Sequence, residues 1–141
     1  MPIWYKEIDV EQVNLYSKKS MVEAIGIDFI EIGDNFIRAR MPVDQRTIQP
    51  AGILHGGASV ALAETLGSVA ANLCVDDTKH VCVGLEINAN HIRSMRSGWV
   101  FGIATPVHLG STTQIWDIRI TNQQDQLVCI SRLTMAVLSK G

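Results

Sequence analysis

Residues 56–74 read GGASVALAETLGSVAANLC, and this stretch decides the fold. Small side chains recur through it, which lets a helix approach a surrounding sheet closely. It is also apolar on nearly every face, and a helix with that pattern is a buried one. The stretch therefore predicts one long central helix, running from Gly56 to Cys74, with other elements packed around it.

Strand patterns stand on both sides of the predicted helix. Before it, Ile27 to Ile32 and Phe36 to Val43 flank the turn cluster Gly33-Asp34-Asn35, which predicts a hairpin. After it come four further strand-like runs, separated by short turn-like clusters, and the last two of them fit a second hairpin. These four runs are Val81 to Arg93, Gly98 to Leu109, Thr112 to Thr121 and Leu127 to Leu138.

Two short helical segments precede the first strand. Asp9 to Ser17 fits a surface helix with Asp9 as its N-cap, and Val10, Val13 and Tyr16 would lie along one side of it. Ser20 fits the cap of a second short helical turn that ends at Gly26.

The order of elements defines the fold class. An antiparallel sheet wrapped around one long helix satisfies it, which is an α+β fold in a single domain spanning residues 1–141. A parallel α/β fold does not, because crossover helices are missing between the later strands.

Composition excludes several functional classes. The 141 residues are 47% hydrophobic, which is enough to form a buried core. They carry a net charge of -2, so a basic nucleic-acid-binding face is not expected. The start lacks a signal peptide, and no run approaches the roughly 18 to 20 apolar residues of a membrane span. Three cysteines form no CxxC pair, which favours reduced thiols in a cytoplasmic protein; a nucleophilic cysteine is the less favoured interpretation.

Glu64 is the only formally charged residue between Arg46 and Asp76. A carboxylate in apolar surroundings is either catalytic or well satisfied by hydrogen bonds. An exposed stripe on the helix would also explain it, and the pattern alone does not decide between these. Ser68 lies one turn later on the same face and would orient the carboxylate or a water molecule, or would serve only as a small packing residue.

The loop before the helix carries Gln49 and the triplet His55-Gly56-Gly57. Glycines at a helix start leave amide N–H groups free at the positive end of the helix dipole, which suits a thioester carbonyl becoming an oxyanion. Alternatively, His55 only caps the helix. No GxSxG elbow, P-loop, HExxH motif or zinc-ligand spacing occurs, so no metal is predicted.

His91 and Arg93 lie near the end of a predicted strand, and residues 108–113 end one later strand and enter the next. A cation, a histidine and hydroxyl or backbone donors at strand ends can hold phosphates. Taken alone, these residues fit a solvated rim and a plain turn better.

Taken together, the motifs resemble a known family. The runs Gln49 to Ser59 and Ala63 to Ser68 are similar to those of hotdog thioesterases of the phenylacetate-degradation type, with Met41 to Asp44 and Pro106 to Gly110 as further matching stretches. The branch most resembled acts on 1,4-dihydroxy-2-naphthoyl-coenzyme A and on aryl carrier-protein thioesters. The similarity extends from Trp4 to Leu138.

The resemblance implies an acyl-coenzyme A thioesterase with no cofactor, coenzyme A being part of the substrate. Glu64 would be the nucleophile or general base, the Gly56 amide would bind the thioester oxygen, and Ser68 would position water. Gln49 and His55 would line the thioester region. The implied contacts to the acyl or coenzyme A portions are Gly84, His91, Ile92, Arg93, Ser94, His108, Leu109, Gly110, Ser111, Thr112 and Thr113. The family also implies a homodimer or a dimer of dimers whose active sites take residues from both partners.

Departures from the family pattern refine this expectation. Ile92 and Ser94 replace a histidine and a proline of the enterobactin-type members, which favours the naphthoyl-coenzyme A type. Neither Ser111 nor Thr112 is the arginine that relatives supply there, which weakens the expected phosphate site. Two other functions compete with hydrolysis: a hotdog hydratase or dehydratase, and a non-catalytic acyl-coenzyme A binding module.

Overall fold

The computed structural model describes all residues, 1–141, and contains every predicted element in the predicted order. Three helices and six strands follow one another along the chain. They are α1 (Val10–Tyr16), α2 (Met21–Ala24), β1 (Asp28–Ile32), β2 (Ile37–Pro42), α3 (Gly56–Leu73), β3 (His80–His91), β4 (Trp99–Leu109), β5 (Thr113–Thr121) and β6 (Leu127–Ser139).

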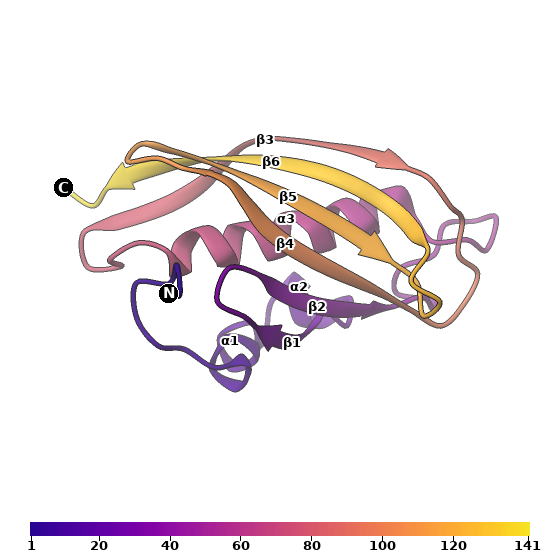
Figure 1. Cartoon of the computed structure of the whole chain (residues 1–141). Helices are drawn as coiled ribbons and strands as arrows, with labels where there is room; N and C mark the ends of the chain where they lie inside the picture. Colours follow the sequence, from indigo (N-terminus) through magenta and orange to yellow (C-terminus); the bar gives the residue numbers. More distant parts are fainter.

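The six strands form one sheet in the order β1-β2-β4-β5-β6-β3, and every neighbouring pair is antiparallel. The sheet curves over α3, which runs beneath it, while α1 and α2 lie beside β1 and β2 (Figure 1). The predicted α+β architecture with one central helix is therefore confirmed. Because β3 is the last strand of the sheet, one of its edges has no strand partner.

Close contact between α3 and the sheet depends on two glycines. A β-carbon at Gly67 would lie 2.5 Å from Cδ2 of Leu133 on β6, and one at Gly102 on β4 would lie 2.5 Å from Cδ1 of Leu66. Leu62, Leu66 and their neighbours on this side of the helix are fully buried. The prediction of a helix buried on nearly every face was too broad, because the side that carries Glu64 is open in the single chain.

Several contacts fix the amino-terminal segment to this core. Trp4 stacks on the buried Trp116 with ring centroids 6.4 Å apart, and its Nε1 donates to the Gly33 carbonyl. Asn14 of α1 pairs through its side-chain amide with the backbone N–H and carbonyl of Phe29. Asp9 and Ser20 cap their helices as predicted. Val13 is the one buried residue of α1, whereas Tyr16 is exposed.

A side chain of α3 occupies part of the open edge of β3. The Asn72 amide donates to the carbonyl of Cys82 (3.2 Å) and accepts from the N–H of Cys82 (2.9 Å). It also donates to the carbonyl of Ser68 within the helix (2.9 Å). Asn72 therefore bonds to the strand as a neighbouring strand would, and the unpaired edge continues beyond it toward His91.

Candidate active site

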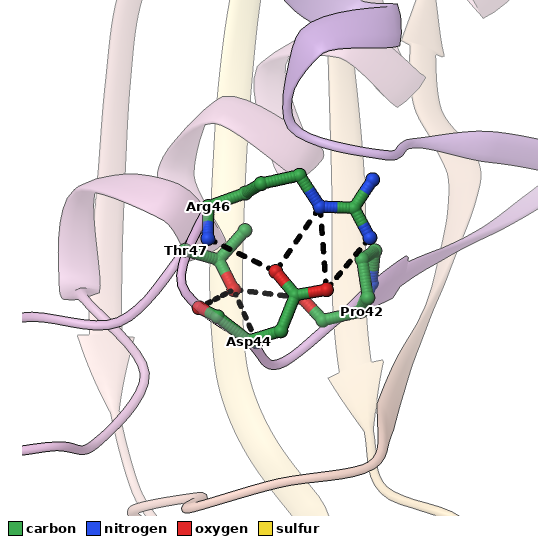
Figure 2. A network of polar contacts seen from close by, with 4 residues as sticks. All are labelled: Pro42, Asp44, Arg46 and Thr47. Atoms are coloured by element: carbon green, nitrogen blue, oxygen red, sulfur yellow. Dashed lines mark hydrogen bonds and ion pairs between the residues drawn. The ribbon is translucent and has the colours of Figure 1, made fainter.

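The loop between β2 and α3 is anchored at its base by a polar network (Figure 2). The buried Thr47 hydroxyl donates to the Pro42 carbonyl (2.7 Å), and the Arg46 guanidinium pairs with Asp44 (2.6 Å). This ion pair holds the pKa of Asp44 below its usual value. The N–H of His55 donates to the Thr47 carbonyl (2.8 Å), which closes the loop and fixes its tip.

Gln49 lies at that tip with its amide orientation determined by the backbone. Its Oε1 accepts a hydrogen bond from the N–H of Ala51. Since a backbone N–H can only donate, the side-chain oxygen must face it and the NH₂ group points elsewhere. No protein acceptor pairs with that NH₂ group, so Gln49 presents a donor for a ligand.

His55 is the N-cap of α3 and presents a second donor. Its Nδ1 accepts from the N–H of Gly57 (2.8 Å), so the neutral ring carries its proton on Nε2. The capping role considered from the sequence is therefore confirmed, and the outward Nε2–H remains available. The N–H of Gly56, the first residue of the helix, has no acceptor in the protein.

A cavity of about 340 Å³ opens at this end of α3. The ring of His91 closes against the helix start, since a β-carbon at Gly56 would lie 2.9 Å from its Nε2. Arg93 lies beyond the end of β3 rather than within it, and its N–H donates to the Val128 carbonyl. The lining residues are Gln49, Ile53, Leu54, Gly56, Ser59, His91, Ile92, Arg93, Ser94 and Val128. Most of the residues predicted to meet substrate near His91 thus share one cavity.

Glu64 lies two turns further along α3, on its open side. Its carboxylate rests on Gly84 of β3 and makes no hydrogen bond within the chain. The interpretation of Glu64 as a buried carboxylate satisfied by hydrogen bonds is therefore wrong for the isolated chain, where Glu64 is exposed. Ser68 is half-buried one turn later, and its carbonyl is held by Asn72.

The single chain separates groups that were predicted to act together. Eight helical residues place Gly56 and Glu64 about 12 Å apart along the helix axis. The turn of residues 108–113 leads into β5, whose first residue, Thr113, pairs with Ala136 on β6. His91 on β3 pairs with Cys129, which lies seven residues away from Ala136 along β6. That spacing corresponds to about 23 Å along the strand. The ring of His108 lies against Gly110 of the same turn, where a β-carbon on the glycine would be 2.6 Å from Nε2 of His108.

The three cysteines have the environments of structural thiols. Burial raises the pKa of Cys74 to about 12, with a smaller contribution from Cys82, and burial also raises the pKa of Cys82 and Cys129. A thiol in such surroundings is a weak nucleophile. No three His, Cys, Asp or Glu side chains gather in a way that could hold a metal ion, and no helix is long and apolar enough to cross a membrane.

Sequence reasoning missed two residues of this region, Ser59 and Asn72. Ser59 was grouped with the small packing residues, although it is a polar residue on the buried side of α3 beside the cavity. Asn72 lies in the stretch 56–74 that predicted the helix, but the sequence pattern gave it no role. An amide on the last turn of a largely apolar helix was the available signal for a specific contact.

An antiparallel sheet curved around one helix, with unpaired donors at the helix start and a carboxylate on its open side, defines a hotdog-fold enzyme that acts on acyl thioesters. The match to the family described as "Thioesterase superfamily" covers residues 51–129. The chain belongs to this family and is a thioester hydrolase.

Relatives match over nearly the whole chain. The 1,4-dihydroxy-2-naphthoyl-CoA hydrolase of Escherichia coli K12 is 52% identical over 136 residues, covering 96% of this chain and 99% of the relative. The proofreading thioesterase EntH of Cronobacter turicensis is 47% identical, covering 96% of this chain and 98% of the relative. A Pseudomonas aeruginosa thioesterase, solved as a glutamine-to-alanine variant, superposes with a TM-score of 0.96 at 51% identity, covering 97% of this chain and 99% of that one.

Proposed function

We propose that this enzyme hydrolyses aryl acyl-coenzyme A thioesters to the free acid and coenzyme A, with Glu64 as the group that delivers or activates the attacking oxygen. The observation that carries the proposal is the set of three unpaired donors at one helix start: the Gly56 N–H, the Gln49 NH₂ group and the His55 Nε2–H. The name of the Escherichia coli relative supports the aryl-coenzyme A substrate class. That class and the three unpaired thiols favour action in the cytoplasm.

The donors suit the charge that develops during thioester hydrolysis. As an oxygen nucleophile adds to the carbonyl carbon, the carbonyl oxygen becomes an oxyanion. The Gly56 N–H lies at the positive end of an 18-residue helix, where negative charge is stabilised. Removing one such donor typically costs about 10²–10³ in turnover.

Glu64 and Gly56 of one chain cannot serve the same carbonyl. Reacting atoms must approach to about 3–3.5 Å, whereas about 12 Å of helix separates the two residues. We therefore infer that Glu64 of one copy completes the site at Gly56 of a second copy in a homodimer or a dimer of dimers. The unpaired edge of β3 and the open side of α3 are the surfaces that such a partner would cover.

Two chemical roles for Glu64 satisfy the atom balance. As a general base, the carboxylate takes a proton from water, whose oxygen bonds to the carbonyl carbon; the C–S bond then breaks and the thiolate receives a proton. As a nucleophile, a carboxylate oxygen bonds to the carbonyl carbon and the thiolate leaves. Water then hydrolyses the resulting anhydride, with Ser68 placed to orient it. Both roles require an ionised Glu64.

The test is thiol release from a panel of acyl-coenzyme A substrates. Glu64→Gln keeps the shape of the side chain but removes the base or nucleophile, so we expect turnover to fall by about 10²–10⁴. Glu86→Gln is the matched control, because Glu86 is exposed on β3 and faces away from the helix. Near-normal turnover in Glu64→Gln, or water addition to a carbon–carbon double bond in place of thiol release, would refute the proposal.

A further inference from the structure

The cavity at the start of α3 has a mouth and a closed floor. Gln49, Gly56 and His91 are the more accessible lining residues at the mouth, and two of the three free donors, on Gln49 and Gly56, belong to this lining. The floor is formed by Leu54, Ser59 and Val128, of which Leu54 is 9% exposed and the other two are 2% exposed. Ser59 is therefore the one hydroxyl on an otherwise apolar floor.

The hydroxyl of Ser59 has no partner in the protein. Its backbone N–H bonds to the His55 carbonyl, but its Oγ takes part in no hydrogen bond with any backbone or side-chain group. Every side-chain polar atom that is wholly inaccessible has a partner. The residual accessible surface of the Ser59 Oγ is therefore directed into the cavity that the residue lines.

The two ends of a thioester substrate have different spatial needs. Coenzyme A is long and charged, so the thiol side must lead outward to solvent from the carbonyl held at Gly56. A pocket with a closed floor can accept only a group that terminates, which is the acyl group. At about 340 Å³ the cavity lies at the small end of ligand pockets, which fits a compact acyl group.

We propose that Ser59 is a specificity-determining residue whose hydroxyl pairs with a hydrogen-bonding substituent on the acyl group. This inference rests on the proposed thioesterase function. An unsubstituted acyl group seated on the floor would leave the hydroxyl without a partner, which is costly in an apolar pocket, whereas an acyl group with its own hydroxyl would satisfy it. The pairing stabilises only substrates with the substituent at the matching position.

The experiment compares kcat/KM for benzoyl-coenzyme A with its 2-, 3- and 4-hydroxy derivatives in the wild type, Ser59→Ala and Ser59→Thr. We expect the wild type to prefer at least one hydroxylated isomer. Ser59→Ala should lower kcat/KM for that isomer by about 3- to 10-fold and leave benzoyl-coenzyme A unchanged or faster. Ser59→Thr retains a hydroxyl and should keep the preference for the same isomer.

The outcomes separate this inference from the function on which it rests. An equal loss on all four substrates in Ser59→Ala would make the residue structural and overturn the inference, with hydrolysis itself intact. An unchanged isomer preference in Ser59→Ala would overturn it as well. If the wild type hydrolyses none of the four thioesters, nor any other acyl-coenzyme A, the proposed function fails and the inference falls with it.

Discussion

The carboxylate of Glu64 lies directly over Gly84 on β3, so that a β-carbon at Gly84 would come within 2.8 Å of Oε2 of Glu64. The strand therefore leaves room for this carboxylate only because it has no side chain at that point. Glu64 is held beside the open edge of the sheet, which is where the proposed partner copy would present its Gly56.

Gly84→Ala should displace Glu64 and lower turnover on acyl-coenzyme A on the order of 10- to 100-fold, because small misplacements of a reacting group have large effects on rate. Melting temperature should stay close to that of the wild type, since alanine is tolerated in an edge strand. Val83→Ala is the control, as Val83 is exposed on the other face of β3. Full activity in Gly84→Ala would show that the contact does not position the carboxylate.

Inactive variants should complement each other if active sites are shared. In a mixed dimer of Glu64→Gln and Gln49→Ala, one site contains both substitutions and the other contains neither. Refolding equal amounts together should therefore restore about a quarter of wild-type activity, because half of the dimers are mixed and one of their two sites is intact. Each variant refolded alone is the control. Activity no higher than the mean of the two controls would place the whole site within one chain.

Features set by neighbouring residues in the sequence could be predicted, whereas features set by contacts between distant parts of the chain could not. The apolar, small-residue pattern of 56–74 predicted α3, and its contacts through Gly67 and Gly102 are the physical reason for that pattern. Alternation predicted the strands within a few residues. The exposure of Glu64 could not be predicted, since charge within an apolar run does not tell whether the sheet or only solvent covers that side of the helix.

Long-range polar contacts were also beyond the sequence pattern. The bonds between Asn72 and Cys82 join residues ten positions apart through the side chain, and no periodicity encodes them. The same holds for Ser59, which shares its cavity with His91 and Val128 from distant strands. Residue type showed that these side chains were polar, but the tertiary fold decides what they meet.

Asn72→Ala should destabilise the protein by roughly 1–3 kcal/mol, because the backbone N–H and carbonyl of Cys82 lose their partner at a partly buried strand edge. Asn88→Ala is the matched control, since Asn88 is an exposed asparagine on β3, the strand of Cys82. Its side chain bonds only to Glu86, at 3.4 Å. Urea unfolding at one fixed protein concentration gives the comparison. Equal midpoints for the two variants would show that the Asn72 contacts contribute nothing.

Alkylating agents should leave the folded enzyme active at pH 8. A thiol whose pKa is raised to about 12, as at Cys74, is ionised in only about one molecule in 10⁴ at that pH, and Cys82 and Cys129 are shifted in the same direction. Because thiolate is the reactive form, iodoacetamide should modify the thiols only after denaturation. Rapid loss of activity together with labelling of the native protein would reopen the possibility of a nucleophilic cysteine.

Arg93 is exposed at the mouth of the cavity, just beyond the end of β3, and the hairpin turn of residues 108–113 supplies no arginine of its own. If the Arg93 guanidinium binds a phosphate of coenzyme A, Arg93→Ala should raise KM about 10- to 100-fold and leave kcat nearly unchanged. The contact would be equally strong in the ground and transition states, and charge-assisted bonds are worth roughly 1.5–3 kcal/mol.

The effect should shrink as salt rises, because exposed charges are screened. It should vanish for an acyl-N-acetylcysteamine thioester, which has no phosphate, and Arg96→Ala, an exposed arginine on the following turn, is the control. Equal losses on the two substrates would show that the Arg93 side chain only supports the cavity mouth.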